Sequence, residues 1–370
     1  MTAALEIGLA ERVRVMIVDD SVVARNLTSR WLQDEPGLDV VTTCRSGREA
    51  VESIAWARPD VVVLDVEMPE MDGVEALPLL LRAKPGLAVV MASSYTTRGA
   101  DLSLRCLALG AMDVLAKPSR DQAQSEEYRR ELLSKVRALG EVAWRRSAAA
   151  SRVANEAAAL ARYAARSVRA GAAAWNPVRA LAIGSSTGGP QALSAVLKAV
   201  GPVAGRVPVL VTQHMPVGFT AALANHLAAA SGVPAREAED GEPLKGGAIY
   251  VAPGGKHFSV ARSGAQAVAR VEDGPPVNFC KPSVDPLFRS AAEVYGPGLL
   301  AVVLTGMGSD GASAAPVVAA AGGRVFAQDE ASSVVWGMPG AAVATGACSA
   351  VLPLSEMGPR IARAIVGERS

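Results

Sequence analysis

Residues 13–33 read VRVMIVDDSVVARNLTSRWLQ, in which an apolar, β-branched run ends in two aspartates and continues into a helical pattern. The run predicts a strand over 13–18, and the residues after it predict a helix over 22–33. The same alternation continues through about the first third of the chain, with further strands predicted at 38–42, 61–65, 87–92 and 112–116. Five strands with helices between them indicate a parallel sheet covered on both faces, which is a doubly wound α/β fold.

The composition is globular and points to the cytoplasm. The chain has 370 residues, half of them hydrophobic and a fifth charged, which suggests two or three domains with separate cores. A formal net charge of +1 argues against nucleic acid as a partner. The four cysteines lie far apart without a CxxC spacing, so we expect free thiols in a reducing compartment. We find neither a signal peptide nor an apolar stretch that could span a bilayer, so we expect a cytoplasmic protein without membrane insertion.

The composition and the pattern of apolar residues change near residue 122 and again near residue 178. The stretch 147–175 is rich in alanine and arginine and poor in large apolar side chains, so we expect a partly helical, solvated linker. Docking of its arginines on an acidic partner is the alternative. We predict a first domain at 11–133, a linker at 134–176 and a second domain at 177–370. This last domain also has a doubly wound α/β pattern, with strands predicted at 178–184, 208–213, 248–252, 299–306 and 323–327.

Charged and hydroxyl side chains follow the strands of the first domain. Asp19 and Asp20 end the first strand, Asp65 ends the third, and Ser93 and Lys117 follow the fourth and fifth. The carboxyl ends of parallel strands meet at one edge of the sheet, where three carboxylates need a cation and hard oxygen ligands suit Mg²⁺. A metal, an ammonium and a hydroxyl beside a carboxylate are what phosphoryl transfer to that carboxylate requires. The alternative is that these aspartates only cap helices and solvate loops.

Four motifs of this region, VDDS (18–21), LDVEMPEMDG (64–73), MASS (91–94) and AKP (116–118), resemble the receiver domain of response regulators. The resemblance covers about residues 12–133. It implies that Asp65 accepts a phosphoryl group and that Asp19 and Asp20 support the Mg²⁺ ion. It also implies that Ser93 and Lys117 contact the phosphoryl group, and that the Lys117–Pro118 bond is cis.

The second domain opens with a strand that runs into GSSTGG (184–189). This loop matches neither GxGxxG nor GxxxxGK[ST], the usual phosphate-binding patterns. It does fit GxSxG, with Ser186 at the centre of a strand-to-helix turn that would raise its hydroxyl above the sheet. A plain glycine-rich turn is the remaining interpretation.

A serine nucleophile needs a base and a group that orients the base. The chain has three histidines, of which His226 lies in a helical pattern and His257 in a turn, whereas His214 ends the predicted strand 208–213. Asp310 lies in a glycine-rich turn after the strand 299–306, where it could orient His214 or merely cap a helix beginning near Gly311. The order Ser, His, Asp differs from the Ser, Asp, His order of the α/β-hydrolases.

Across residues 178–366 the motifs IGSSTGG, TQHMPVGFT, VAPGGKH, KPSVDPLF and LTGMGSDGA resemble the chemotaxis protein-glutamate methylesterase family, CheB. The resemblance implies that Ser186 is the nucleophile, His214 the base, Asp310 its orienter, and the Met307 backbone N–H an oxyanion donor. It implies methyl-accepting chemotaxis receptors as substrates, a chemotaxis histidine kinase as phosphodonor, and no cofactor in the catalytic domain. It also implies that specific receptor glutamines are deamidated. The alternatives are a response regulator with a DNA- or protein-binding output, and a hydrolase of small esters.

Overall fold

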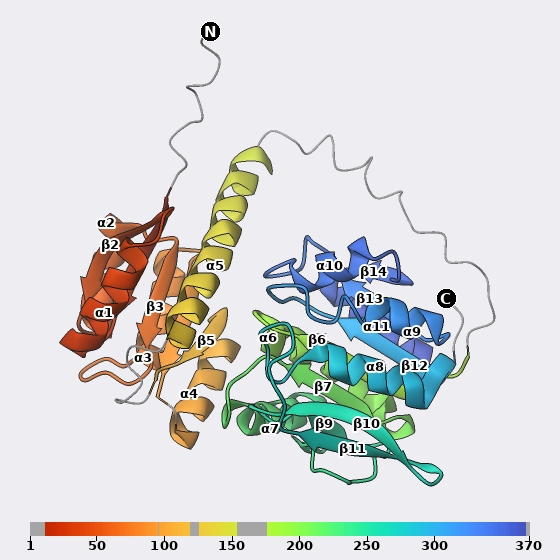
Figure 1. The fold of residues 1–370 in the computed structure, drawn as a ribbon. Coiled ribbons are helices and arrows are strands. Elements are labelled where there is room, and N and C mark those ends of the chain that lie inside the picture. The colour runs from red at the N-terminus through yellow and green to blue at the C-terminus, as the bar shows by residue number, and fades with distance from the viewer. Residues whose placement is uncertain (1–11, 95, 119–125, 154–175, 368–370) are drawn as a thin grey trace. The chain divides into compact units, whose positions relative to one another are not determined.

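The chain forms two compact units, one within residues 1–160 and one within residues 161–370. The computed structural model describes residues 12–94, 96–118, 126–153 and 176–367 (Figure 1). No helix among these residues is long and apolar enough to cross a membrane.

The first unit contains a five-stranded parallel sheet in the order β2-β1-β3-β4-β5. The central strand β3 is buried along its whole length, as expected for a sheet that is covered on both faces. The strands are β1 (Val13–Val18), β2 (Leu38–Cys44), β3 (Val61–Asp65), β4 (Ala88–Ser93) and β5 (Asp113–Ala116), and the helices are α1 (Val22–Gln33), α2 (Gly47–Ala57), α3 (Gly73–Ala83), α4 (Thr97–Ala108) and α5 (Glu126–Val153). The predicted doubly wound fold is confirmed.

The second unit contains a seven-stranded parallel sheet in the order β14-β13-β12-β6-β7-β9-β8 and a separate antiparallel hairpin of β10 and β11. Its strands are β6 (Ala180–Ser185), β7 (Val209–Gln213), β8 (Ala235–Glu237), β9 (Ile249–Val251), β10 (His257–Ser263), β11 (Gln266–Glu272), β12 (Leu299–Val303), β13 (Arg324–Gln328) and β14 (Ala350–Leu352). Its α-helices are α6 (Gly189–Val200), α7 (Phe219–Ser231), α8 (Val284–Tyr295), α9 (Ala315–Ala320), α10 (Met338–Ala344) and α11 (Leu354–Val366). Strand β6 pairs with both β12 and β7, so the loops after these three strands are neighbours.

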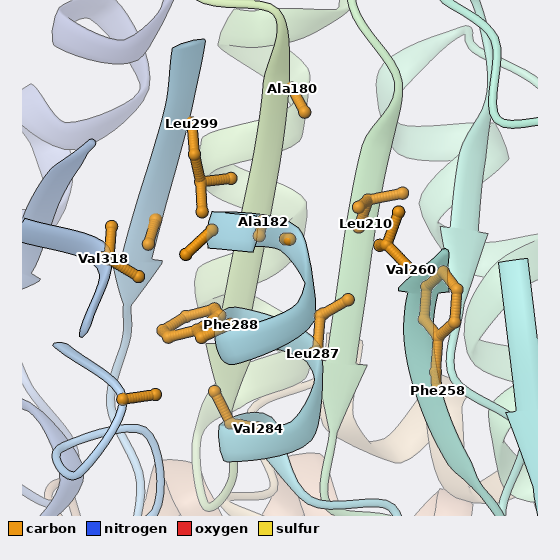
Figure 2. Close-up of a cluster of buried hydrophobic side chains, with 14 of the residues drawn as sticks. Ala180, Ala182, Leu210, Phe258, Val260, Val284, Leu287, Phe288, Leu299 and Val318 are labelled. Carbon is orange, nitrogen blue, oxygen red and sulfur yellow. The ribbon is translucent and has the colours of Figure 1, made fainter. Parts of the chain in front are cut away.

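The core of the second unit forms around α8. Figure 2 shows Val284, Leu287 and Phe288 of this helix directed at the sheet, near Ala182 of β6 and Leu210 of β7. Each of these five side chains is fully buried. Full burial of a Val, Leu or Phe side chain contributes about 1.5–3 kcal/mol, so the three core residues of α8 hold the helix firmly against the strands.

Some expectations about single elements were wrong or incomplete. The structure adds β8, β14 and the β10–β11 hairpin, which we did not predict. Among the described residues the cis peptide bond is Lys281–Pro282, and Lys117–Pro118 is not cis. Helix α5 continues past residue 133 to Val153. The domain limits 11–133 and 177–370 remain predictions, and most of the alanine- and arginine-rich stretch falls outside the described residues.

Candidate catalytic site and phosphorylation site

The two adjacent serines at the end of β6, Ser185 in the strand and Ser186 just after it, have different surroundings. Ser185 is fully buried, and its hydroxyl donates to Gln213 Oε1 at 2.6 Å. Ser186 is partly exposed, and its backbone N–H donates to the Thr305 carbonyl at 3.0 Å. A Cβ atom added to Gly306 would lie 2.8 Å from the Ser186 Cβ, so the loop after β12 packs directly against this serine. Of the two, Ser186 is therefore the serine whose side chain a solvent-borne substrate can reach.

His214 begins the loop after β7 and is held from both ring nitrogens. Its backbone N–H donates to the Ser185 carbonyl at 3.1 Å, which fixes residue 214 beside the end of β6. Its Nε2 lies 2.8 Å from Asp310 Oδ2, and its Nδ1 lies 3.4 Å from Cys280 Sγ. These three side chains offer metal-type ligand atoms within 4.8 Å of one another. Asp310 and Cys280 contact different ring nitrogens of His214.

The Asp310 carboxylate lies at the N-terminus of α8. Its side chain is only 2 % exposed. Besides His214, its hydrogen-bond donors are Ser283 Oγ (2.8 Å), Val284 N (2.6 Å), Asp285 N (3.2 Å), Asn278 Nδ2 (2.9 Å) and Gly311 N (3.0 Å). The carboxylate thus satisfies free N–H groups of a helix start and lies at its positive end. The alternative that Asp310 caps only a helix beginning near Gly311 is wrong, because its main contacts are with α8 and His214.

Burial and hydrogen bonds act in opposite directions on this pair. Burial alone would raise the pKa of Asp310, but the hydrogen bond and charge of His214 and the backbone N–H of Val284 lower it to about 2. Burial likewise disfavours the charged form of His214, but the hydrogen bond that His214 donates to Asp310 and its contact with Cys280 more than offset this, so the pKa of His214 lies above its usual value. Asp310 is therefore ionised at neutral pH and stabilises an imidazolium at position 214.

Two glycines allow α8 to approach the strand ends. A Cβ on Gly184 would lie 2.4 Å from Val284 Cγ1, and a Cβ on Gly311 would lie 3.0 Å from the same atom. Gly311 also has a φ of +87°, which favours glycine. Val284 therefore fits between the end of strand β6 and the loop after β12, and this packing brings the helix start to Asp310.

Met307 belongs to the same loop as Gly306. The Gly306 carbonyl accepts hydrogen bonds from Gly337 N at 3.1 Å and Met338 N at 2.8 Å, which fixes the backbone immediately before residue 307. The next residue, Gly308, has a φ of +82°. The assignment of the Met307 N–H as an oxyanion donor stays a prediction.

The residues of the predicted phosphorylation site lie close together at the carboxyl end of the first unit's sheet, and phosphorylation itself stays a prediction. Asp19, Asp20 and Asp65 offer carboxylate oxygens within 4.8 Å of one another. Lys117 Nζ lies 2.7 Å from Asp19 Oδ2 and 2.7 Å from Asp65 Oδ2. Burial raises the pKa of Asp65 to about 6 despite the opposing charge of Lys117. Three convergent carboxylates, two of them buried, suit a hard divalent cation such as Mg²⁺.

Ser93 Oγ is fully buried and has no hydrogen-bond partner among the described residues. A buried hydroxyl without a partner costs about 1–3 kcal/mol. Asp65 of β3 pairs with Ala92 of the neighbouring strand β4, and Ser93 is the next residue along β4. A phosphoryl oxygen on Asp65 would offer this hydroxyl an acceptor.

Sequence reasoning missed three residues of the second site. Cys280, Asn278 and Ser283 reach His214 or Asp310 from a segment without strand or helix pattern. His257 is buried and links the ends of this segment, because its Nε2 contacts the Pro275 carbonyl at 3.0 Å and its Nδ1 accepts from Ser283 N at 3.3 Å. The sequence signal was that Ser283 lies within the motif KPSVDPLF and that Cys280 directly precedes it.

Comparison with known proteins gives consistent matches to both units. The family model of the response regulator receiver domain matches residues 15–128, and that of the CheB methylesterase matches residues 181–361. The chain is 52% identical over 372 residues to a protein-glutamate methylesterase/protein-glutamine glutaminase of Rhodopseudomonas palustris, covering 97% of this chain and 96% of the relative. It is 51% identical over 375 residues to a protein of the same name from Nitrobacter hamburgensis, covering 100% and 98%. It also resembles the crystal structure of the Thermotoga maritima CheB methylesterase catalytic domain, with 37% identity, a TM-score of 0.49, and coverage of 51% of this chain and 99% of that chain.

Proposed function

Because this chain belongs to the protein-glutamate methylesterase/protein-glutamine glutaminase family, with a CheB methylesterase domain and a receiver domain, we propose that it demethylates methyl-accepting chemotaxis receptors. The reaction is hydrolysis of glutamate γ-methyl esters in the cytoplasm, and its biological outcome is sensory adaptation. The catalytic groups are Ser186, His214 and Asp310.

The proposed reaction begins with attack of Ser186 Oγ on the ester carbonyl carbon. In this proposal His214 accepts the serine proton at Nδ1, the ring nitrogen that Cys280 Sγ contacts at 3.4 Å in this structure, and the Asp310 carboxylate at Nε2 stabilises the imidazolium that forms. The charge on the tetrahedral oxygen is met by backbone N–H groups, with Met307 as the proposed donor. His214 then protonates the leaving methoxide, so methanol departs and an acyl-enzyme remains.

Water completes the cycle through the same groups. His214 takes a proton from water, the hydroxide attacks the acyl carbon, and Ser186 leaves with the proton returned. The product is a free glutamate carboxylate. A glutamine side chain can follow the same path with ammonia as the leaving group, which accounts for the proposed deamidation of specific receptor glutamines.

The observation that carries this proposal is the 2.8 Å bond between His214 Nε2 and the buried Asp310, which follow the two strands that flank β6, and the partly exposed Ser186 follows β6 itself. The test is methanol release from a methylated receptor fragment. We expect S186A to lose roughly 10³- to 10⁶-fold in rate. Its matched control is S185A, which should remain within about tenfold of the wild type because Ser185 is buried against Gln213. Comparable loss in both variants would contradict the assignment of the nucleophile.

We also propose that phosphorylation of Asp65 by the chemotaxis histidine kinase raises the esterase rate. Asp19, Asp20 and Asp65 would hold Mg²⁺, which when bound neutralises charge on the incoming phosphoryl oxygens. Lys117 and Ser93 would then contact the phosphoryl group, a proposal supported by the ion pairs of Lys117 and the unpartnered Ser93 hydroxyl.

A further inference from the structure

The segment 277–280 is a tight turn beside the catalytic groups. Val277 N donates to the Cys280 carbonyl at 3.1 Å and Cys280 N donates to the Val277 carbonyl at 2.9 Å, so two residues separate the paired ends. Those residues, Asn278 and Phe279, have φ values of +53° and +62°. Two left-handed residues in a two-residue hairpin define a type I′ turn, for which Asn-Gly is the preferred sequence. Asn278 fits the first position, whereas Phe279 stands where glycine fits best.

Phe279 is unfavourable in the free protein in two respects. A bulky aromatic residue with a positive φ is a backbone outlier. The residue is also 91 % exposed, more than any other large hydrophobic residue among those described. Phe279 takes no part in the aromatic or cation–π contacts among the described residues. Strain and exposed apolar surface of this kind occur where a ligand or partner binds.

The turn is rigidly connected to the groups that we propose for catalysis. Asn278 Nδ2 donates to Asp310 Oδ1 at 2.9 Å and to Asp285 Oδ2 at 2.8 Å. On the other side of Phe279, Cys280 Sγ lies 3.4 Å from His214 Nδ1. The residues before and after Phe279 thus contact the base and its orienter, so this exposed aromatic residue belongs to the same turn as both contacts.

We infer that Phe279 is a specificity-determining residue that packs against apolar side chains of the protein substrate next to the methylated glutamate. This inference rests on the proposed function. It predicts that the phenyl ring distinguishes a glutamate ester in a folded polypeptide from the same ester in a small molecule. The binding energy comes from burying an aromatic side chain that is already held in place, which costs little conformational entropy.

The experiment compares F279G and F279L on two substrates, a methylated receptor fragment and N-acetyl-glutamate γ-methyl ester, with methanol release as the readout. We expect F279G to lower kcat/KM for the receptor at least tenfold, mainly through KM, and to change kcat/KM for the small ester less than threefold. F279L should recover most of the receptor activity. F279G should also raise the urea midpoint of unfolding, because glycine suits the turn. R58G, which removes a residue with a φ of +42° from the first unit, is the matched control and should leave both activities as in the wild type.

A binding measurement keeps the test independent of turnover. In an S186A background, which leaves the ester intact, F279G should weaken binding of the methylated receptor at least tenfold. Equal losses on both substrates would overturn the inference, because Phe279 would then only support the catalytic groups. Unchanged receptor activity and binding would also overturn it, as would a higher rate without phosphodonor, since the ring would then contact the receiver unit. Wild-type protein that cleaves the small ester but releases no methanol from the receptor would overturn the proposed function itself, and this inference with it.

Discussion

At the scale of single residues, the Asp310 carboxylate controls the pKa of His214. Asp310 raises the pKa of His214 above the ordinary value, and a general base must be neutral to accept a proton. The esterase rate should therefore rise with pH through a pKa above about 6.5. In D310N the negative charge is lost, so the pKa of His214 should fall and the maximal rate should drop by roughly 10⁴-fold.

The chain has only three histidines, so NMR titration of the imidazole C–H signals can measure this directly. His226 offers an internal contrast because burial lowers its pKa. We expect the His214 signal to titrate above 6.5, the His226 signal below 6.5, and only the former to move in D310N. A His214 signal that titrates below 6.5 in the wild type would be incompatible with the ion pair described here.

Cys280 should make the enzyme sensitive to alkylation. Burial raises the pKa of Cys44 to about 11, of Cys106 to about 12 and of Cys348 to about 11, which suppresses their thiolates. Cys280 Sγ instead lies 3.4 Å from His214 Nδ1. We expect iodoacetamide at pH 8 to modify Cys280 first by peptide mass spectrometry, and esterase activity to fall more than tenfold in parallel. C280A should retain activity and resist the reagent; equally fast inactivation of C280A would locate the sensitive group elsewhere.

At the scale of elements, the catalytic geometry depends on how closely α8 approaches β6. A Cβ on Gly184 would lie 2.4 Å from Val284 Cγ1, so G184A forces the helix start away from the strand. We expect a loss of about 1–3 kcal/mol in the free energy of unfolding, measured in urea, because overpacking strains a dense core. The esterase rate should also fall at least tenfold, since Val284 N and Asp285 N hold Asp310.

The double variant G184A/V284A tests the cause of that loss. Removing the two Cγ atoms of Val284 clears the closest contacts of the new methyl group. The double variant should therefore regain part of the activity, and the two substitutions should couple by about 0.5–3 kcal/mol. Strict additivity would show that Gly184 is required for another reason.

The elements that sequence patterns predicted well are those with strong local signals. The strand VRVMIV and the buried strand VVVLD were predicted with their observed limits, because continuous β-branched runs are typical of a parallel sheet. The hairpin β10–β11 was missed because its alternation is weak, with SVARS and QAVARV mixing small, charged and apolar residues. Strands β8 and β14 have only three residues each, and they form by pairing with β9 and β13 in the sheet.

The candidate sites were predictable to the extent that topology brings strand ends together. Ser186, His214 and Asp310 follow strands β6, β7 and β12, which are neighbours in the sheet, so parallel pairing brings the three loops to one edge. Among the described residues, a hydrogen bond joins His214 to Asp310, whereas none joins the Ser186 side chain to His214. The contact of Asp310 with the start of α8 was not predictable, because it depends on Val284 fitting between two glycines. The contact of Cys280 with His214 was likewise not predictable from the sequence, because Cys280 lies in a turn that has no helix or strand periodicity.

At the scale of the whole molecule, the chain combines two sheets with separate chemistry. Each sheet gathers its polar groups at the carboxyl ends of its strands, Asp65 and Lys117 in one and His214 and Asp310 in the other. Such an arrangement lets one site change without disturbing the core of the other. Coupling between them then depends on a free-energy difference between two states of the chain, which phosphorylation of Asp65 would bias.

The coupling can be tested at Asp65. In D65N the phosphoryl acceptor is lost, while the second unit keeps its sequence and its hydrogen bonds. We expect acetyl phosphate with Mg²⁺ to stimulate methanol release by the wild type and by D101N, a control that changes an exposed aspartate of α4, but not by D65N. Chelation of Mg²⁺ should abolish the stimulation. A shift from 1 % to 99 % active chain would require about 5.5 kcal/mol of bias, so partial activation is the expected size. Stimulation of D65N to the wild-type extent would mean that the phosphodonor acts at another residue, and that the buried carboxylates around Lys117 serve stability alone.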